Sequence, residues 1–183
     1  MEQQKNRILL HACCAVCLGY SIQKLFEKDY EPIVFFFNPN IFPSKEYERR
    51  KNELVEFCKK KSYQYIVEED ETDFLWRDFI KGYENEPEKG QRCNLCFEYR
   101  LNRTFEKAKE LGIKEITTTL TISPHKISKN IFEIGRRICE NSEINFLEID
   151  FKKENGFLLT NKIAEKYGLY RQNYCGCEFS KKK

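Results

Sequence analysis

The sequence predicts an α/β fold: one domain with a mostly parallel sheet of about five strands and helices on both faces. Strand-like and helix-like segments alternate along most of the 183 residues, and this length suits a single domain. The chain also holds 15 Phe and 10 Tyr, which supply enough large apolar side chains for a core despite 33% charged residues. We therefore expect residues 1–183 to form one domain, in which residues 169–183 are a tail without periodicity.

The first half of the chain alternates between apolar runs, which are typical of strands, and apolar residues spaced by three and four, which are typical of helices. Ile33–Phe37 is β-branched or aromatic throughout, as in a strand buried on both faces. Ser44 is positioned to cap a helix. The predicted strands are residues 8–10, 33–37 and 63–67, and the predicted helices are residues 18–26, 44–61 and 73–80.

The second half continues this alternation after a polar loop over residues 82–92. Ser128 is positioned to cap a helix, and Gly112 and Gly168 are positioned to end helices. The predicted helices are residues 94–111, 128–138 and 157–167, and the predicted strands are residues 115–120 and 145–149. Because ligands of such folds bind beyond the carboxyl ends of the strands, we expect a site formed by residues 11–17, 38–43 and 121–126.

Charge and hydropathy limit the classes of function. Lys and Arg total 32 against 29 Asp and Glu, so the net charge of +3 does not indicate a general nucleic-acid binder, and RNA affinity would need a local patch. No apolar run approaches the ~20 residues that cross a bilayer, and the N-terminus lacks the layout of a secretory signal. We expect a cytoplasmic protein with no membrane partner.

Nine cysteines are the unusual feature of the composition. In a reducing compartment, clustered cysteines are more often metal ligands or redox groups than structural disulfides. Cys13, Cys14 and Cys17 lie at a predicted strand-to-helix turn, where backbone donors stabilise thiolates, and Cys93 and Cys96 open the long helix. A [4Fe-4S] cluster is favoured over structural zinc, because adjacent cysteines are awkward in a tetrahedral knuckle.

The remaining cysteines differ in context. Cys175 and Cys177 flank one glycine, so they could form an easily reduced disulfide that exchanges two electrons, a second metal knuckle or a pair of incidental thiols. Cys58 and Cys139 are expected to be packing residues.

Other polar residues are open to two interpretations. His11 could bind a metal or a cluster sulfur, or could be a satisfied buried histidine, and His125 could contact substrate or solvent. Asp73 and Asp150 could serve as ligand or acid, or could cap helices. Stacking and guanidinium groups suited to a nucleotide precede the tail cysteines: Tyr170, Arg171, Gln172 and Tyr174. Cations that could contact phosphate, or simply face solvent, are Lys126, Lys129, Arg136, Arg137 and Lys181–Lys183.

The segments HACCAVC, FFFNPNIFPSKEYERR, EPEKGQRCNLCFEYRL, TTTLTISPHKIS, DFKKENGF and LYRQNYCGCEFS together resemble the QueH-type epoxyqueuosine reductases, in order and nearly end to end. The resemblance implies reduction of epoxyqueuosine to queuosine at the wobble position of a tRNA anticodon loop, without cobalamin, and a Rossmann-like sheet of the HUP or PP-loop type.

The same resemblance implies roles for the cysteines. Cys13, Cys14, Cys93 and Cys96 correspond to the ligands of a [4Fe-4S] cluster, and Cys175 with Cys177 corresponds to a redox-active disulfide. A further mononuclear metal ion, such as iron, is implied beside the cluster, and Cys17 and Asp73 are its candidate ligands. An iron that polarises the epoxide oxygen and a nearby acid would complete the chemistry, with electrons from an unidentified donor.

Two other functions remain open at this point. The chain could be a zinc-stabilised RNA-binding module without redox activity, which would hold zinc and no sulfide. It could also be a nucleotide-dependent PP-loop enzyme such as a tRNA sulfur transferase. Against the latter, the first strand leads into His11-Ala12-Cys13-Cys14 instead of a Gly/Ser-rich phosphate loop.

Overall fold

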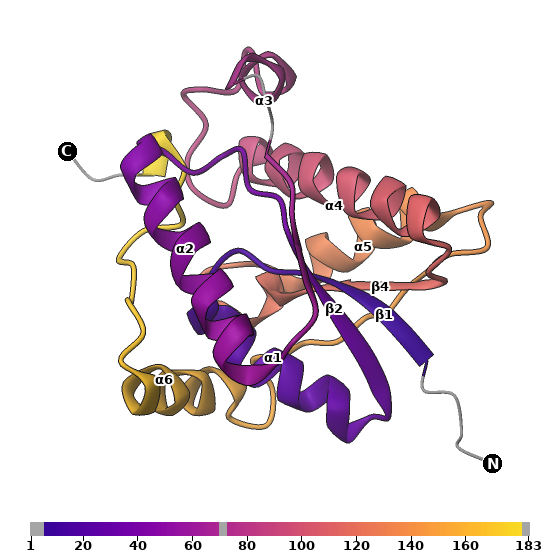
Figure 1. The fold of residues 1–183 in the computed structure, drawn as a ribbon. Helices are drawn as coiled ribbons and strands as arrows, with labels where there is room; N and C mark the ends of the chain where they lie inside the picture. The colour runs from indigo at the N-terminus through magenta and orange to yellow at the C-terminus, as the bar shows by residue number, and fades with distance from the viewer. Residues whose placement is uncertain (1–5, 70–72, 181–183) are drawn as a thin grey trace.

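The computed structural model describes residues 6–69 and 73–180, without the side chains at positions 73 and 74. In this part of the chain, a five-stranded sheet has the order β3-β2-β1-β4-β5, and every neighbouring pair is parallel (Figure 1). The strands are β1 (Asn6–His11), β2 (Tyr30–Phe36), β3 (Tyr65–Val67), β4 (Glu115–Thr118) and β5 (Asn145–Phe146). The predicted fold class is confirmed.

Helices cover both faces of the sheet, as the sequence predicts. On one face, α1 (Ala15–Glu27) contacts α2 (Ser44–Lys61) and α6 (Gly156–Tyr167), and on the other α4 (Gln91–Leu111) packs against α5 (Ser128–Cys139) (Figure 1). The short helix α3 (Asp73–Phe79) lies against α4. Alternate residues of β2 enter the two cores, Phe35 on the α4 side and Val34 and Phe36 on the α2 side, so burial on both faces is confirmed.

Several predicted boundaries are wrong for local reasons. β4 ends at Thr118, because the chain enters a 3-10 helix (Thr119–Ile122) in which Thr118 Oγ1 accepts a hydrogen bond from the Leu120 amide at 3.2 Å. Ser44 and Ser128 are the first helical residues, not caps: the cap positions belong to Pro43 and Ile127, and neither makes a side-chain cap bond.

Other predicted ends agree with the structure. Gly112 and Gly168 follow α4 and α6 with φ of 65° and 64°, the left-handed conformation that glycine adopts without strain. β5 is confirmed as a strand but keeps only two of its five predicted residues. None of the helices in residues 6–69 and 73–180 combines the length and apolarity that a bilayer crossing requires.

The strand order places a crevice at the carboxyl edge of the sheet. The chain moves outward from β1 through β2 to β3 and then returns to the other side of β1 as β4 and β5. The connections after β1 and β4 therefore diverge, and folds of this kind bind ligands at such a point. The tail after α6 returns to this edge, where the Phe42 amide donates to Gly176 O at 2.8 Å.

Candidate active site

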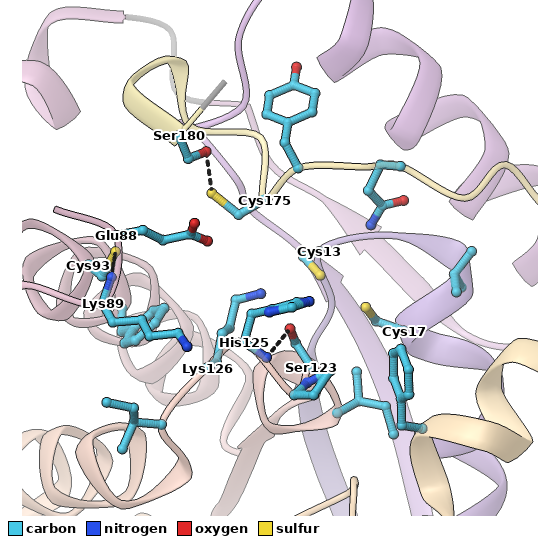
Figure 2. Close-up of a pocket in the computed structure, with 18 of the residues that line it drawn as sticks. Cys13, Cys17, Glu88, Lys89, Cys93, Ser123, His125, Lys126, Cys175 and Ser180 are labelled. Carbon is cyan, nitrogen blue, oxygen red and sulfur yellow. Dashed lines mark hydrogen bonds between the residues drawn. The ribbon is translucent and has the colours of Figure 1, made fainter. Parts of the chain in front are cut away.

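A cavity of about 750 Å³ opens at this edge of the sheet. The segments that follow β1, β2 and β4 all contribute to its lining, as the strand pattern predicts, and the starts of α1 and α4 and the tail complete it. Four cysteines line the cavity from three directions: Cys13 and Cys17 on one wall, Cys93 on the facing wall and Cys175 from the tail (Figure 2). Members of both cysteine clusters and one of the two tail thiols thus share one chamber.

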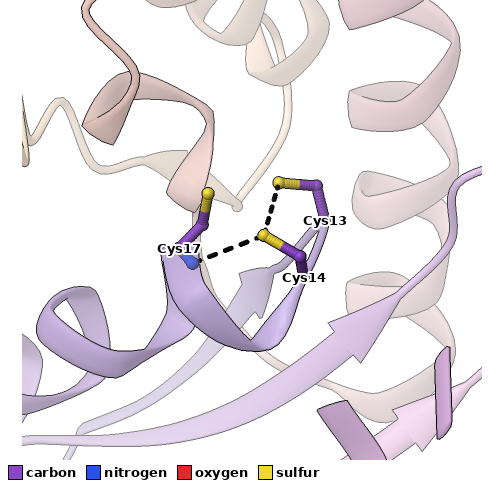
Figure 3. Close-up of side chains that lie close together, drawn as sticks. All are labelled: Cys13, Cys14 and Cys17. Carbon is purple, nitrogen blue, oxygen red and sulfur yellow. Dashed lines mark hydrogen bonds between the residues drawn. The ribbon is translucent and has the colours of Figure 1, made fainter. Parts of the chain in front are cut away.

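Cys13, Cys14 and Cys17 form a compact triad whose sulfur atoms all lie within 4.8 Å of one another (Figure 3). Cys14 is the N-cap of α1, so its Sγ accepts a hydrogen bond from the Cys17 amide at 3.4 Å, and it lies 3.8 Å from Cys13 Sγ. Backbone donors at a helix N-terminus favour a thiolate there. The start of α1 therefore presents three sulfur ligands to one point.

Hydrogen bonds among the three thiols of the triad favour the ionisation of one of them at the expense of the other two. Hydrogen bonds from Cys14 and Cys17 hold the pKa of Cys13 well below its usual range. The bond to Cys13 raises the pKa of Cys14 to about 12, and hydrogen bonds to both partners raise the pKa of Cys17. Cys13 is thus the thiolate of the group, which suits a site that binds a cationic metal centre.

Cys93 and Cys96 lie at the start of α4, as predicted, but face different surroundings. Cys93 lines the cavity and accepts a hydrogen bond from the Lys89 amide at 3.3 Å (Figure 2). Cys96 is buried in a small apolar cluster with Trp76, Ile80 and Cys177. Burial raises the pKa of both thiols. Among the described residues, the compact ligand group is the triad at α1, and Cys93 and Cys96 stand outside it.

Cys175 and Cys177 have unlike environments. Cys175 Sγ lies 2.9 Å from Ser180 Oγ and accepts from the Cys177 amide at 3.4 Å (Figure 2). Hydrogen bonds from the Cys177 thiol and from Ser180 lower the pKa of Cys175 to about 5, and the same pairing raises the pKa of Cys177. Gly176 between them has a φ of 109°, and a Cβ there would lie 2.9 Å from Ile41 Cγ1. Only glycine fits this turn, which directs one sulfur into the cavity and buries the other.

A buried arginine fixes the tail. Arg50 is 1% exposed and donates from Nη1 to Cys175 O at 3.1 Å and from Nη2 to Tyr174 O at 3.2 Å, while its Nε donates to Glu46 at 2.7 Å. Upstream, the Tyr170 amide donates to Glu53 Oε1 at 2.6 Å. Helix α2 therefore holds the segment that carries the tail cysteines.

A second buried arginine lies beside the cysteines. Arg100 is 3% exposed, lines the cavity and donates to Cys96 O at 3.1 Å and to Asn38 Oδ1 at 3.3 Å. It has no acidic partner among the described residues. Its positive charge lowers the pKa of both Cys13 and Cys96, although other causes are larger.

His11 is a satisfied buried histidine, one of the two predicted interpretations. Its Nδ1 lies 2.8 Å from Thr118 Oγ1 and its Nε2 lies 3.2 Å from Phe37 O, so both ring nitrogens are engaged. Burial lowers its pKa to about 4, which keeps the ring neutral. It joins β1, β2 and β4 at the base of the site.

The other predicted polar residues divide between cavity and surface. His125, Lys126 and Arg171 line the cavity together with Gln172 and Tyr174. Asp150 pairs with Lys152 at 3.2 Å and is not part of the lining, and Arg136 and Arg137 pair with Glu148 and Glu98 on the outside of α5. Lys129 is also exposed and faces Glu133. The side chain of Asp73 and residues Lys181–Lys183 lie outside the described residues.

Cys58 and Cys139 are confirmed as packing residues. Both are buried in the apolar cores, and burial raises the pKa of Cys58 to about 12 and of Cys139 to about 11. Thiols in such surroundings are unreactive.

Sequence reasoning missed three residues that shape the site: Arg50, Arg100 and Thr160. Arg50 stands in a run of charged residues, and Thr160 stands in an ordinary amphipathic helix, so nothing local distinguishes either from a surface residue. Their burial depends on the packing of the tail and of α6 against α1. An arginine four residues after Cys96 was the one available signal for Arg100, since it repeats the helical spacing of that face.

The donor set fits a thiolate-bound iron–sulfur cluster. Sulfur atoms from two helix N-termini face one chamber, and backbone amides donate to Cys14 and Cys93. Such N–H to sulfur bonds and nearby positive charge stabilise an anionic cluster and tune its potential. Arg100 supplies that charge.

A family model and individual proteins similar to this chain carry the same description. Residues 8–183 match the family model described as "Epoxyqueuosine reductase QueH". A protein of that name from Streptococcus pyogenes serotype M1 is 38% identical over 190 residues, which cover 99% of this chain and 72% of that protein. A second, from Acinetobacter baylyi, is 37% identical over 181 residues, which cover 98% of this chain and 83% of the relative.

Among solved structures, the U34-tRNA thiolase NcsA from Methanococcus maripaludis, described with its [4Fe-4S] cluster, aligns with a TM-score of 0.60 at 12% identity. The alignment covers 98% of this chain and 63% of the thiolase. At this identity the likeness shows a shared fold.

Proposed function

Since the chain belongs to the epoxyqueuosine reductase QueH family, we propose that it converts epoxyqueuosine to queuosine in tRNA by a two-electron reductive removal of the epoxide oxygen. The observation that carries the proposal is the convergence of Cys13, Cys17, Cys93 and Cys175 on one cavity at the switch point of the sheet. A chamber lined by thiols suits electron transfer to a bound substrate.

We assign a [4Fe-4S] cluster to Cys13, Cys14, Cys93 and Cys96. Cys13 and Cys14 belong to the triad, and Cys93 lies on the facing wall of the same cavity. When bound, the cluster supplies one-electron transfer. Cys17 lies within 4.8 Å of the other triad sulfurs, which supports it as a ligand of an additional mononuclear iron, with Asp73 as its proposed partner.

The two tail thiols can supply the electrons and protons that the reaction consumes. Removal of the epoxide oxygen as water leaves an alkene and consumes two electrons and two protons. Oxidation of Cys175 and Cys177 to a disulfide releases two electrons and two protons, so one dithiol reduces one epoxide. A separate electron donor then reduces the disulfide. No cobalamin enters this scheme, and the reducing cytoplasm is the compartment we propose for it.

The substrate reaches the site as a base turned out of an anticodon loop, where no duplex has to be opened. Three cations on the cavity wall, Lys89, Lys126 and Arg171, have no acidic partner among the described residues. They are placed to contact the phosphates that flank that base.

The test is an anaerobic assay of reconstituted, cobalamin-free protein on tRNA that carries epoxyqueuosine, with a chemical reductant and nucleoside mass spectrometry. The wild-type chain forms queuosine. Cys175→Ser keeps the iron absorbance and loses at least 100-fold in turnover, the order expected when a reacting group is removed, whereas Cys93→Ser loses iron itself. Iron bound normally by Cys93→Ser would reject its role as a ligand, and full turnover by Cys175→Ser would reject the redox pair.

A further inference from the structure

Three residues that line the cavity each carry a buried polar atom that has no hydrogen-bond partner among the described residues: Asn40 Oδ1, Thr160 Oγ1 and Gln172 Oε1. Asn40 and Thr160 are each 2% exposed. They come from three separate segments, the loop after β2, helix α6 and the tail, yet all three line the chamber that Cys13 and Cys17 enter. A buried polar group without a partner is costly, and native proteins keep few of them.

Thr160 is the clearest of the three. A threonine inside a helix commonly donates its hydroxyl to the carbonyl four residues earlier. Two other helical hydroxyls of this chain do so, Thr104 to Arg100 O at 2.8 Å and Ser21 to Cys17 O at 2.9 Å. Thr160 does not, although α6 offers it the same kind of carbonyl.

The two polar atoms of the Gln172 amide differ in their hydrogen bonding. Its Nε2 donates to Cys14 Sγ at 3.0 Å, which fixes the side chain beside the cysteine triad, while its Oε1 is buried and has no hydrogen-bond partner among the described residues. Asn40 adds a second amide oxygen without a partner, and it directly precedes Ile41, the residue that a Cβ at position 176 of the tail would meet.

The chemistry of these atoms selects a class of ligand. Two amide oxygens accept hydrogen bonds only, and a hydroxyl can accept as well. The part of a ligand that satisfies them must bring hydroxyl or N–H donors and cannot be an anionic group. The cations Lys89, Lys126 and Arg171 on the cavity wall have the opposite preference, so the cavity distinguishes a donor-rich end of its ligand from an anionic end.

We propose that Asn40, Thr160 and Gln172 recognise the hydroxyl and amine donors of the modified base, and so determine which base is accepted and how it is oriented beside the cysteines. This inference rests on the proposed function, because it takes the substrate to be a nucleotide with such a base. A base without these donors would leave the three atoms unpaired, a strong basis for discrimination.

The test compares substrate affinity and stability in the same variants, with an anticodon stem-loop that carries epoxyqueuosine as the probe. Thr160→Val keeps the shape and removes the hydroxyl, so we expect the KM to rise about three- to tenfold, the loss of one hydrogen bond. The Tm without substrate stays equal or rises, because an unsatisfied polar group has been removed. Thr160→Ser keeps the hydroxyl, so its KM should equal that of the wild type. Asn40→Leu removes an acceptor at a second position and should raise the KM as Thr160→Val does.

The matched control is Thr117→Val, at a buried threonine on β4 whose hydroxyl donates to Leu147 O at 2.9 Å. It should lower the Tm and leave the KM unchanged. An unchanged KM in both Thr160→Val and Asn40→Leu, or a lowered Tm in both with rescue by Thr160→Ser, would overturn the inference, the latter because it shows a structural bond. Failure of the wild-type chain to act on the stem-loop would instead reject the proposed function.

Discussion

Cys175 and Cys177 differ in their surroundings although one glycine separates them. Cys175 lines the cavity and accepts hydrogen bonds, whereas Cys177 is 6% exposed and lies among Trp76, Ile80 and Cys96. A half-buried thiolate that reaches a cavity, beside a buried thiol, is the arrangement of a nucleophilic and a resolving cysteine. In the proposed reaction, Cys175 is therefore the member of the pair that meets the substrate side.

The acidity of Cys175 can be measured by alkylation. Because hydrogen bonds lower its pKa to about 5, the thiolate persists as the pH falls and is lost only near that value. We expect the iodoacetamide rate of Cys175 in the cluster-free protein to stay level from pH 8 to about 6 and to fall below that. Peptide mass spectrometry gives the rate for each cysteine. Ser180→Ala removes one donor and should shift the fall to higher pH, while a rate that climbs steadily to pH 9 would contradict the assignment.

For single residues, the sequence predicts which side chains form the site better than it predicts their protonation and their hydrogen-bond partners. The spacing of Cys13, Cys14, Cys17, Cys93 and Cys96 indicates a sulfur-rich centre because neighbouring residues share a helix start. The neutral state of His11 is beyond prediction, because its partners Thr118 and Phe37 lie on two other strands. The unpartnered state of Thr160 is beyond prediction for the same reason, since it requires knowing every neighbour.

The link between α2 and the tail is the element on which the redox pair depends. Arg50 joins Glu46 on its own helix to the carbonyls of Tyr174 and Cys175. The sulfur positions of the tail are thus set by a residue 125 positions away in the sequence.

Loss of this link should loosen the tail and leave the sheet intact. Arg50→Met removes three donors, two of which hold the tail carbonyls, and leaves the half-buried Glu46 with the Tyr170 hydroxyl at 3.2 Å. We therefore expect chymotrypsin to cleave after Tyr170 or Tyr174 about tenfold faster, with circular dichroism unchanged. Lys51→Met is the control, because Lys51 forms ion pairs with Glu48 and Glu69 at 2.8 and 2.6 Å and lies over the Tyr47 ring, and no described hydrogen bond or ion pair joins it to the tail. Equal cleavage rates in the two variants would show that Arg50 does not hold the tail.

The packing of helix α5 on the sheet, on the same face as α4, can be tested at Gly135. A Cβ at Gly135 would overlap the ring of Phe146 on β5. Gly135→Ala should lower the free energy of unfolding by about 1–2 kcal/mol, because overpacking outweighs the gain in helix propensity. Asn102→Ala, at an exposed position of α4, should raise it by a few tenths of a kcal/mol. Urea denaturation measures both, and a stabilised Gly135→Ala variant would refute the close contact.

Helices and strands could be predicted where residues close together in the sequence determine them. Apolar periodicity locates α1, α4 and α6, and glycine in the left-handed conformation marks the ends of α4 and α6. Ser44 and Ser128 are the first helical residues and not caps, and the Ser128 hydroxyl instead accepts a hydrogen bond from Lys152 Nζ. The early end of β4 depends on a hydrogen bond within the Thr-rich segment, which no spacing rule reports.

In the whole molecule, the strand order concentrates the chemistry in one place. β1 is central, and the segments that follow its neighbours β2 and β4, residues 38–40 and 123–126, meet around Cys13 although they lie far apart in the sequence. Alternation of strands and helices predicts this edge as the site. It does not predict that the tail crosses back over it, because the tail has no periodicity and its path follows from Arg50 and Phe42.

The central claim is that thiols gathered in this cavity deliver two electrons to one epoxide. The most direct test is a single turnover: the reconstituted protein is fully reduced, the reductant is removed anaerobically, and an epoxyqueuosine stem-loop is added. The account predicts one molecule of queuosine per chain and one new disulfide between Cys175 and Cys177, both absent in Cys175→Ser. Product formed by Cys175→Ser in the same amount, or product without loss of the two thiols, would contradict it.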